Sequence, residues 1–249
     1  MIFASTLKNA LRENLATATT FGFVSVSKVE NILIPLPPFD EQKRLIEKFT
    51  EITKHLGKME YSYASLSKMV EAAKKKILDS IFGQNSSYKS YYENKKSILN
   101  DVEIYDYLRK PINADERSAR IAKAKQLYPY YGATGQTGVI DDYLIDGEYI
   151  LLGEDGAPFL DKYSEKAYLI NGKAWVNNHA HILKSKTNNK FLMYYLNWFN
   201  YKEYVSGTTR LKLNQGMLKR IPFPDIPSTL KDKIVCYIES AFKILKLIN

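Results

Sequence analysis

The sequence predicts an α+β fold, in which one mainly β lobe with small helices is attached to long helices of the coiled-coil type. Residues 39–84 carry apolar side chains at alternating spacings of four and three, which is the coiled-coil period. Residues 85–228 instead carry short β-prone runs separated by glycine turns. With 249 residues, 45% of them hydrophobic and 25% charged, the chain can bury a substantial core. The composition therefore excludes a disordered, fibrous or disulfide-stapled protein.

Residues 1–38 have the pattern of the last part of a lobe whose body is absent. The segment Ile34-Pro35-Leu36-Pro37-Pro38 precedes the first long helix, and Ile221-Pro222-Phe223-Pro224 precedes a second one. The shorter segments before each proline run occur in the same order and, to within about two residues, at the same spacing. We therefore expect a repeat of lobe, helix, lobe and helix, in which only the tail of the first lobe is present.

A long helix is predicted over residues 39–84. Pro37-Pro38 ends the preceding segment, Asp40 can cap the first free N–H groups, and Gly83 marks the end. At about 1.5 Å per residue, the roughly 42 residues from Asp40 to Ile81 span roughly 63 Å, far longer than a typical core helix. Its apolar stripe is expected to bind a partner through Leu45, Phe49, Ile52, Leu56, Leu66, Val70 and Ile77.

The mainly β lobe is predicted between the two helices, over residues 85–228. Apolar runs at residues 148–152 and 167–170 have the length of strands, and Asn171-Gly172 marks a turn after the second of them. An apolar stretch at residues 191–201 is long enough for a helix and closes the lobe.

A second, shorter helix is predicted over residues 229–249, where an apolar stripe recurs. At about 1.5 Å per residue it covers roughly 30 Å, or about half of the first helix. Stripe residues of the first helix such as Leu66, Val70 and Ile77 would then be left uncovered. We therefore expect association, either with a second copy of the chain or with other subunits.

The net charge of +9 suggests a polyanionic partner, and nucleic acid is the first candidate. No single segment is strongly basic, so the charge supports this only weakly. The lone Cys236 excludes an internal disulfide and suits a reducing compartment. No stretch approaches the roughly 18 apolar residues of a membrane-spanning helix, and no signal-peptide pattern occurs. These features predict a cytoplasmic protein with no membrane contact.

The motifs of an enzyme acting on nucleic acid are missing: there is no amino-methylation motif, glycine-rich phosphate loop or nuclease motif. His179 and His181 would share one face of a strand and could hold a metal, so a small metal-dependent enzyme is one alternative. Glu154 and Asp155 could add oxygen ligands, but acidic residues beside glycine more often serve turns. We therefore predict neither a catalytic nor a metal site.

Two clusters point to contacts with nucleic acid. Basic and aromatic residues alternate over residues 117–131 and are followed by Gly132-Ala133-Thr134-Gly135, while residues 208–214 combine hydroxyl, guanidinium, ammonium and amide groups. Lysine and arginine bind phosphates, tyrosine offers a ring face, and a glycine turn lets backbone N–H groups approach a phosphate closely.

Two parts of the sequence closely resemble the specificity (S) subunit of type I restriction-modification enzymes. The junction at residues 34–46, where the proline run opens the long helix, is one of them. The lobe is the other, and it is similar to one class of target-recognition domain. In the lobe the resemblance rests on residues 110–112, 128–135, 142–143, 147–156, 173–181 and 207–211.

The resemblance implies a DNA-recognition subunit that is not itself an enzyme. In this family each of two target-recognition domains would read one half of a bipartite double-stranded DNA site, and two antiparallel helices would space them. Adenine methylation with S-adenosylmethionine would belong to modification subunits, and ATP- and Mg²⁺-dependent translocation and cleavage to restriction subunits. The chain itself would bind no cofactor, and it would contain one whole recognition domain and the tail of another.

The same resemblance implies which residues contact DNA. The cations would bind phosphates or guanine edges: Lys110, Arg117, Arg120, Lys173, Arg210 and Lys212. The amides and hydroxyls would read bases or fix loops: Asn177, Asn178, Asn214, Thr208 and Thr209. Further contacts are expected from Tyr130, Tyr131, Thr134 and His179. A second alternative is that the chain is a remnant, which binds modification subunits through its helices and does not read DNA.

Overall fold

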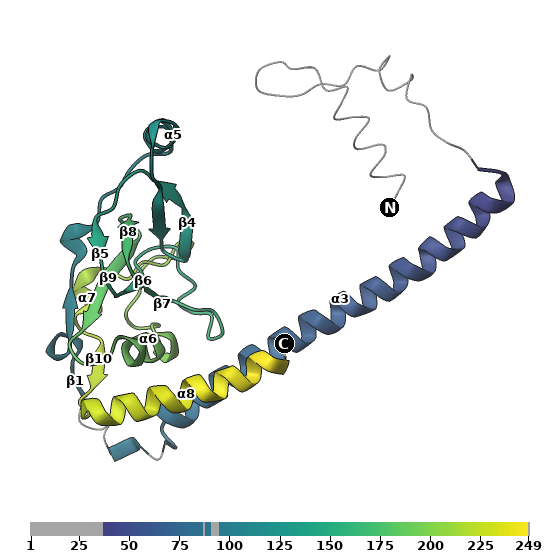
Figure 1. Cartoon of the computed structure of the whole chain (residues 1–249). Helices are drawn as coiled ribbons and strands as arrows, with labels where there is room; N and C mark the ends of the chain where they lie inside the picture. The colour runs from purple at the N-terminus through teal and green to yellow at the C-terminus, as the bar shows by residue number, and fades with distance from the viewer. Residues whose placement is uncertain (1–36, 87, 91–94, 249) are drawn as a thin grey trace. The chain divides into compact units, whose positions relative to one another are not determined.

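The structure is a computed structural model, and it describes residues 37–86, 88–90 and 95–248 (Figure 1). The chain divides into two compact units, residues 1–62 and 63–249. The boundary falls inside one continuous helix, α3 (Phe39–Phe82). The repeat unit predicted at residues 1–38 lies, apart from its last two residues, outside the described residues.

The two halves of α3 differ in burial although the same apolar stripe runs through both. In the first half Phe49 and Ile52 are each 48% exposed. In the second half Val70 is 5% exposed, and Ile77 packs against the main core. The expectation that Val70 and Ile77 would be left uncovered is therefore wrong, because the second half of the helix is built into the domain that follows it.

The main core lies around an antiparallel sheet of four strands in the order β2-β9-β6-β7. The central strands β6 and β9 are almost wholly buried, which explains why β6 is a continuous apolar run rather than an alternating one. The helix α6 covers this sheet and lies between it and α8 (Figure 1). The bounds are β2 (Val102–Ile104), β6 (Tyr149–Gly153), β7 (Ala167–Ile170), β9 (Ala180–Ser185), α6 (Asn189–Trp198) and α8 (Ser228–Ile248).

A second sheet of four strands has the order β4-β3-β8-β5. Its central pair, β3 and β8, is parallel, with Tyr130 opposite Trp175, and the other pairs are antiparallel. Tyr130 and Trp175 form a small core with Ile140, and the short helix α5 lies against β4. The bounds are α5 (Ala114–Lys123), β3 (Tyr128–Gly132), β4 (Gly135–Ile140), β5 (Ile145–Asp146) and β8 (Lys173–Val176).

The remaining elements connect these sheets to α8. The two-stranded sheet of β1 and β10 precedes α8, and α7 lies between α6 and β10 in the chain. Ile234 and Ile238 of α8 share the main core with Leu78 and Ile81 of α3. The bounds are β1 (Lys95–Ser97), η1 (Ile98–Asn100), η2 (Asp106–Leu108), α7 (Gln215–Leu218) and β10 (Pro222–Pro224).

A buried ion pair fixes the start of α8 to the domain. The Lys231 ammonium is 3% exposed and donates to Asp101 Oδ1 at 3.0 Å and to Thr187 Oγ1 at 2.8 Å. Burial raises the pKa of Asp101, but hydrogen bonds from Ser185, Thr187 and Lys231 outweigh it and bring the pKa below its usual value.

These sheets and helices confirm the predicted α+β class, in which a lobe of strands and small helices is attached to long helices. Among the described residues, no helix combines the length and the apolar character needed to cross a membrane.

Candidate nucleic-acid interface

Four loops that are far apart in the sequence meet in the lobe, and we call them the four-loop surface. Asn177 donates its backbone N–H to the Tyr131 carbonyl at 3.1 Å. A Cβ atom at Gly153 would lie 2.9 Å from the Ala133 carbonyl oxygen, so glycine is needed for this close approach. The four loops are residues 132–135, 153–156, 177–179 and 206–212.

Backbone hydrogen bonds connect the other loops to one another. Glu154 donates its N–H to the His179 carbonyl at 2.7 Å and accepts at its own carbonyl from Leu213, also at 2.7 Å. Gly156 donates to the Leu211 carbonyl at 3.1 Å. The positions of these loops are thus fixed by main-chain atoms, and the side chains at their tips are left for other contacts.

Asp155 is the centre of the polar contacts on this surface. Its Oδ1 accepts a hydrogen bond from Arg210 Nη2 at 2.7 Å, and His179 Nδ1 lies 2.8 Å from the same oxygen. Gly156 has a φ of +71° and adjoins the guanidinium: a Cβ atom there would lie 3.3 Å from Arg210 Nε. Glycine therefore lets the guanidinium lie close to the backbone of this loop.

Glu154 forms a second set of ion pairs beside Asp155. Its carboxylate pairs with Arg109 through Oε2 and with Lys212 Nζ through Oε1, the latter at 3.2 Å. Arg109 also donates to the Ala180 carbonyl at 3.2 Å. The Lys212 side chain is 51% exposed, so its ammonium is accessible despite this contact.

A buried histidine connects the four-loop surface to the main sheet. His181 Nδ1 lies 2.6 Å from Asp106 Oδ2, and its Nε2 lies 2.8 Å from the Leu213 carbonyl oxygen. Burial raises the pKa of Asp106, but the hydrogen bond and charge of His181, the Ile182 N–H and the charge of Arg109 outweigh it and lower the pKa below its usual value.

This arrangement speaks against the metal-site alternative. Both ring nitrogens of His181 already face protein oxygens, so neither is available to a metal. Glu154 and Asp155, considered as oxygen ligands, form ion pairs with arginine and lysine instead. Within the described ranges, no group of three or more possible metal ligands occurs.

The other predicted cations lie over aromatic rings in or beside the second sheet, and we call Lys110, Arg117, Arg120 and Lys173 the aromatic-stacked cluster. The Arg117 guanidinium is 4.7 Å from the Tyr130 ring centroid, and that of Arg120 is 4.9 Å from the Trp175 ring centroid. Arg120 Nε also donates to Asp141 Oδ1 at 2.7 Å. The half-buried guanidiniums therefore hold α5, which has no buried residue, against the sheet.

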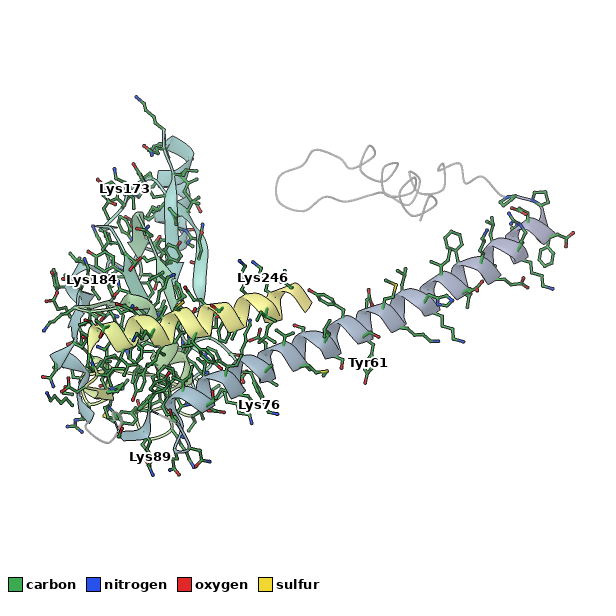
Figure 2. All side chains as sticks on the ribbon, turned by 60° about the horizontal axis from the view of Figure 1, so that its bottom comes forward. Tyr61, Lys76, Lys89, Lys173, Lys184 and Lys246 are labelled. Carbon is green, nitrogen blue, oxygen red and sulfur yellow. The ribbon has the colours of Figure 1, made fainter. Side chains whose placement is uncertain are left out.

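The two lysines of the aromatic-stacked cluster are more exposed. Lys110 Nζ lies 5.9 Å from the Trp175 ring centroid, and Lys173 Nζ lies 4.5 Å from that of Tyr143. Interaction with the Tyr143 hydroxyl raises the pKa of Lys173 above its usual value. Lys173 lies at the surface of the lobe, where its charge is accessible (Figure 2).

The predicted DNA-contact residues thus lie in two groups, the four-loop surface and the aromatic-stacked cluster. Some of them make contacts within the protein that stabilise the fold. Asn214 caps α7, because its Oδ1 accepts from the Met217 N–H at 2.9 Å, and the buried Asn177 accepts from the His179 N–H at 2.8 Å. Tyr131 packs on Tyr168 with ring centroids 5.9 Å apart. The four-loop surface collects Thr134, Asn178, His179, Thr208, Thr209, Arg210 and Lys212.

Sequence reasoning did not place Asp155, Glu154 and Arg109 among the residues of a DNA-binding surface, although they contact its cations or loops. The carboxylates follow β6 directly, and acidic residues beside glycine after a buried strand are the only local signal. Their partners Arg210 and Lys212 are more than fifty residues away in the chain, so no local pattern connects them.

Comparison with known proteins identifies the family to which the sequence belongs. The sequence model described as the type I restriction modification DNA specificity domain matches residues 89–248. A Haemophilus influenzae protein described as a type I restriction enzyme specificity subunit is 35% identical over 140 residues, which are 55% of this chain and 34% of that protein. This chain therefore spans about a third of that relative's length.

Solved structures share the fold. A chain from a study of complex assembly and conformational transition of the type I R-M system has a TM-score of 0.62 at 16% identity, over 97% of this chain and 62% of that one. The S subunit of a type I restriction-modification system from M. genitalium has a TM-score of 0.52 at 16% identity, over 98% of this chain and 67% of that one. Because the family model covers well over half of the sequence, the chain belongs to the type I restriction modification DNA specificity domain family.

Proposed function

We propose that this chain supplies DNA sequence specificity to a type I restriction-modification complex. Its recognition domain would read one half of a bipartite double-stranded DNA target, and its helices would dock modification subunits. Methylation with S-adenosylmethionine, and ATP- and Mg²⁺-dependent translocation and cleavage, would be carried out by partner subunits. The observation that carries the proposal is the four-loop surface, on which exposed polar and charged side chains from four parts of the chain meet.

The chemistry of the four-loop surface suits a DNA groove. Arg210 and Lys212 are exposed cations, Thr208 and Thr209 are exposed hydroxyls, and Asn178 is an exposed amide. Guanidinium, amide and hydroxyl groups read base edges, whereas lysines mainly bind phosphates. Lys110 and Lys173 of the aromatic-stacked cluster would add phosphate contacts, with smaller contributions from the half-buried Arg117 and Arg120.

The first half of α3 supports a docking role. Phe49, Ile52 and Leu56 are each close to half exposed, and Leu45 is partly buried. We propose this stripe as the surface that binds modification subunits, with Leu66 extending it. A second copy of the chain is the competing occupant, because a heptad stripe pairs readily with another helix. The mass of the protein in solution, measured by light scattering with and without a modification subunit, separates the two.

The test of the proposed function is methylation mapping. The full chain is mixed with a modification subunit, S-adenosylmethionine and a library of random duplexes, and the methylated adenines are located by sequencing. We expect the methylated adenines to share a sequence context that the modification subunit alone does not produce. If the chain binds the modification subunit but the methylated adenines share no sequence context, the result would instead support the alternative that the chain is a remnant, which binds modification subunits without reading DNA.

A further inference from the structure

We infer that Arg210 recognises a guanine edge in the major groove and that Asp155 is the positioning residue that holds its guanidinium for this contact. The assignment, which rests on the proposed function, selects one residue from six predicted cations and adds a carboxylate that was not among the predicted DNA contacts. Guanine is the base that suits arginine, because its O6 and N7 acceptors accept two parallel N–H bonds from a planar guanidinium.

The geometry presents an oriented and accessible guanidinium. The Arg210 side chain is 62% exposed, whereas that of Asp155 is 20% exposed, so the carboxylate lies behind the guanidinium rather than beside open solvent. The contact uses Nη2, and a guanidinium has five N–H donors in a fixed plane. Most of its donors are therefore left for DNA, while rotation of the side chain is restricted.

The backbone holds this pair in place. Gly156 and Leu211 directly follow Asp155 and Arg210 in the two loops, and the Gly156 N–H donates to the Leu211 carbonyl at 3.1 Å. Asp155 also forms an isolated β-bridge with Lys212. Because both loops are connected through main-chain atoms, the side-chain pair is positioned before DNA arrives, and less rotational freedom is lost on binding.

The acidic partner favours a base contact over a phosphate contact. A carboxylate 2.7 Å from the guanidinium cancels much of its attraction for a phosphate, and it would itself repel a phosphate placed nearby. The same carboxylate weakens a pair of directed hydrogen bonds to guanine much less, because guanine carries no net charge. Arg117 and Arg120 differ, because their guanidiniums already lie on protein rings and are only partly accessible.

The test uses the methylation assay with the full chain and asks for the base preference at each position of the target. Arg210→Lys keeps the charge but loses the planar pair of donors, and Asp155→Asn keeps the shape but loses the carboxylate. We expect each variant to lose a guanine preference at the same single position, by about 5- to 150-fold, with preferences elsewhere unchanged. The double variant should lose no more at that position than Arg210→Lys alone, because Asp155 acts through Arg210.

Controls separate this role from a structural one. Arg220→Lys changes another exposed arginine in the same way and should leave all base preferences unchanged. Thermal melting of each variant should match the wild-type chain. If Arg210→Lys keeps every base preference of the wild type, the assignment of Arg210 is overturned and the proposed function stands. If Asp155→Asn lowers methylation equally on all sequences, Asp155 is not the positioning residue. A wild-type chain that confers no shared sequence context overturns the proposed function itself.

Discussion

The aromatic-stacked cluster and the four-loop surface are both rich in cations, yet these cations have different partners. In the first, guanidiniums lie on the rings of Tyr130 and Trp175 and connect a polar helix to a sheet. In the second, Arg210 and Lys212 contact carboxylates at the tips of loops and remain more than half exposed. The comparison teaches that a half-buried guanidinium on a ring stabilises the fold, whereas a cation that is more than half exposed beside a carboxylate can be presented to a ligand.

The largest effect is expected beneath the four-loop surface, at His181. His181→Ala removes one of the partners of the buried Asp106 and the donor to the Leu213 carbonyl, and it leaves a cavity at a fully buried ring, so we expect a loss of about 3–5 kcal/mol in the free energy of unfolding. Urea unfolding followed by circular dichroism measures it. His179→Ala is the matched control two residues away, and its half-exposed ring should cost less than about 1 kcal/mol. Equal losses for both variants would contradict the buried role of His181.

A smaller loss of stability is expected in the aromatic-stacked cluster. Arg120→Ala removes the contact with Trp175 and the ion pair with Asp141, and about 1–2 kcal/mol of unfolding free energy should be lost. Lys123→Ala, on the same helix but exposed, should change stability by less than about 0.5 kcal/mol. Arg210→Ala should likewise leave stability within about 0.5 kcal/mol. If Arg210→Ala lost more unfolding free energy than Arg120→Ala, the four-loop surface rather than the aromatic-stacked cluster would be the one whose cation stabilises the fold.

Lys212 tests whether the four-loop surface contacts phosphates as well as bases. Lys212→Ala should weaken binding to all duplexes alike and reduce the slope of log affinity against log salt concentration by about 1. Fluorescence anisotropy with a labelled duplex at several salt concentrations measures both quantities. An unchanged slope would mean that the ammonium is engaged by Glu154 alone.

The pH dependence of stability should depend on Lys166, a cation with neither a ring nor a carboxylate in direct contact. The residue is 2% exposed, its ammonium donates to the Asp161 and Ser164 carbonyls, and burial lowers its pKa to about 8 from 10.5. Between these values the unfolded chain binds more protons than the folded one, so this group should make stability rise as the pH increases from 8 towards 10. Lys166→Met should abolish that rise in urea unfolding measured at several pH values. A variant that keeps the rise would show that another group causes it.

The sequence predicts the strands of the main sheet better than it predicts the small helix of the second sheet. β6 and β7 are apolar runs because their residues are buried in the lobe, and burial leaves a local pattern. α5 has no buried residue, so it has no apolar stripe, and its sequence was interpreted only as a basic and aromatic run. Its signals are an Asn113 cap and acidic residues in the first turn, which are weaker than periodicity.

The candidate site could be predicted only in part for a related reason. The sequence identifies Arg210 and His179 as candidates, because residue type and neighbours are local properties. That both contact Asp155 depends on loops brought together by the fold, and no spacing in the chain encodes it. Likewise the heptad pattern of α3 predicts a helix, but whether Val70 or Phe49 is covered depends on what packs against each half.

The main-chain connections of the four-loop surface have a consequence for how new specificities arise. Because Glu154, Gly156 and Leu213 hold the loops through backbone atoms, the frame does not depend on which side chains stand at the tips. Exchanges at exposed tips such as Thr208 or Asn178 should cost less than about 0.5 kcal/mol of folding free energy. A lineage can therefore sample many combinations of tip residues, one substitution at a time, without passing through unfolded intermediates. For engineering, these tips are the positions to randomise, while Gly153 and Gly156 are the positions to keep.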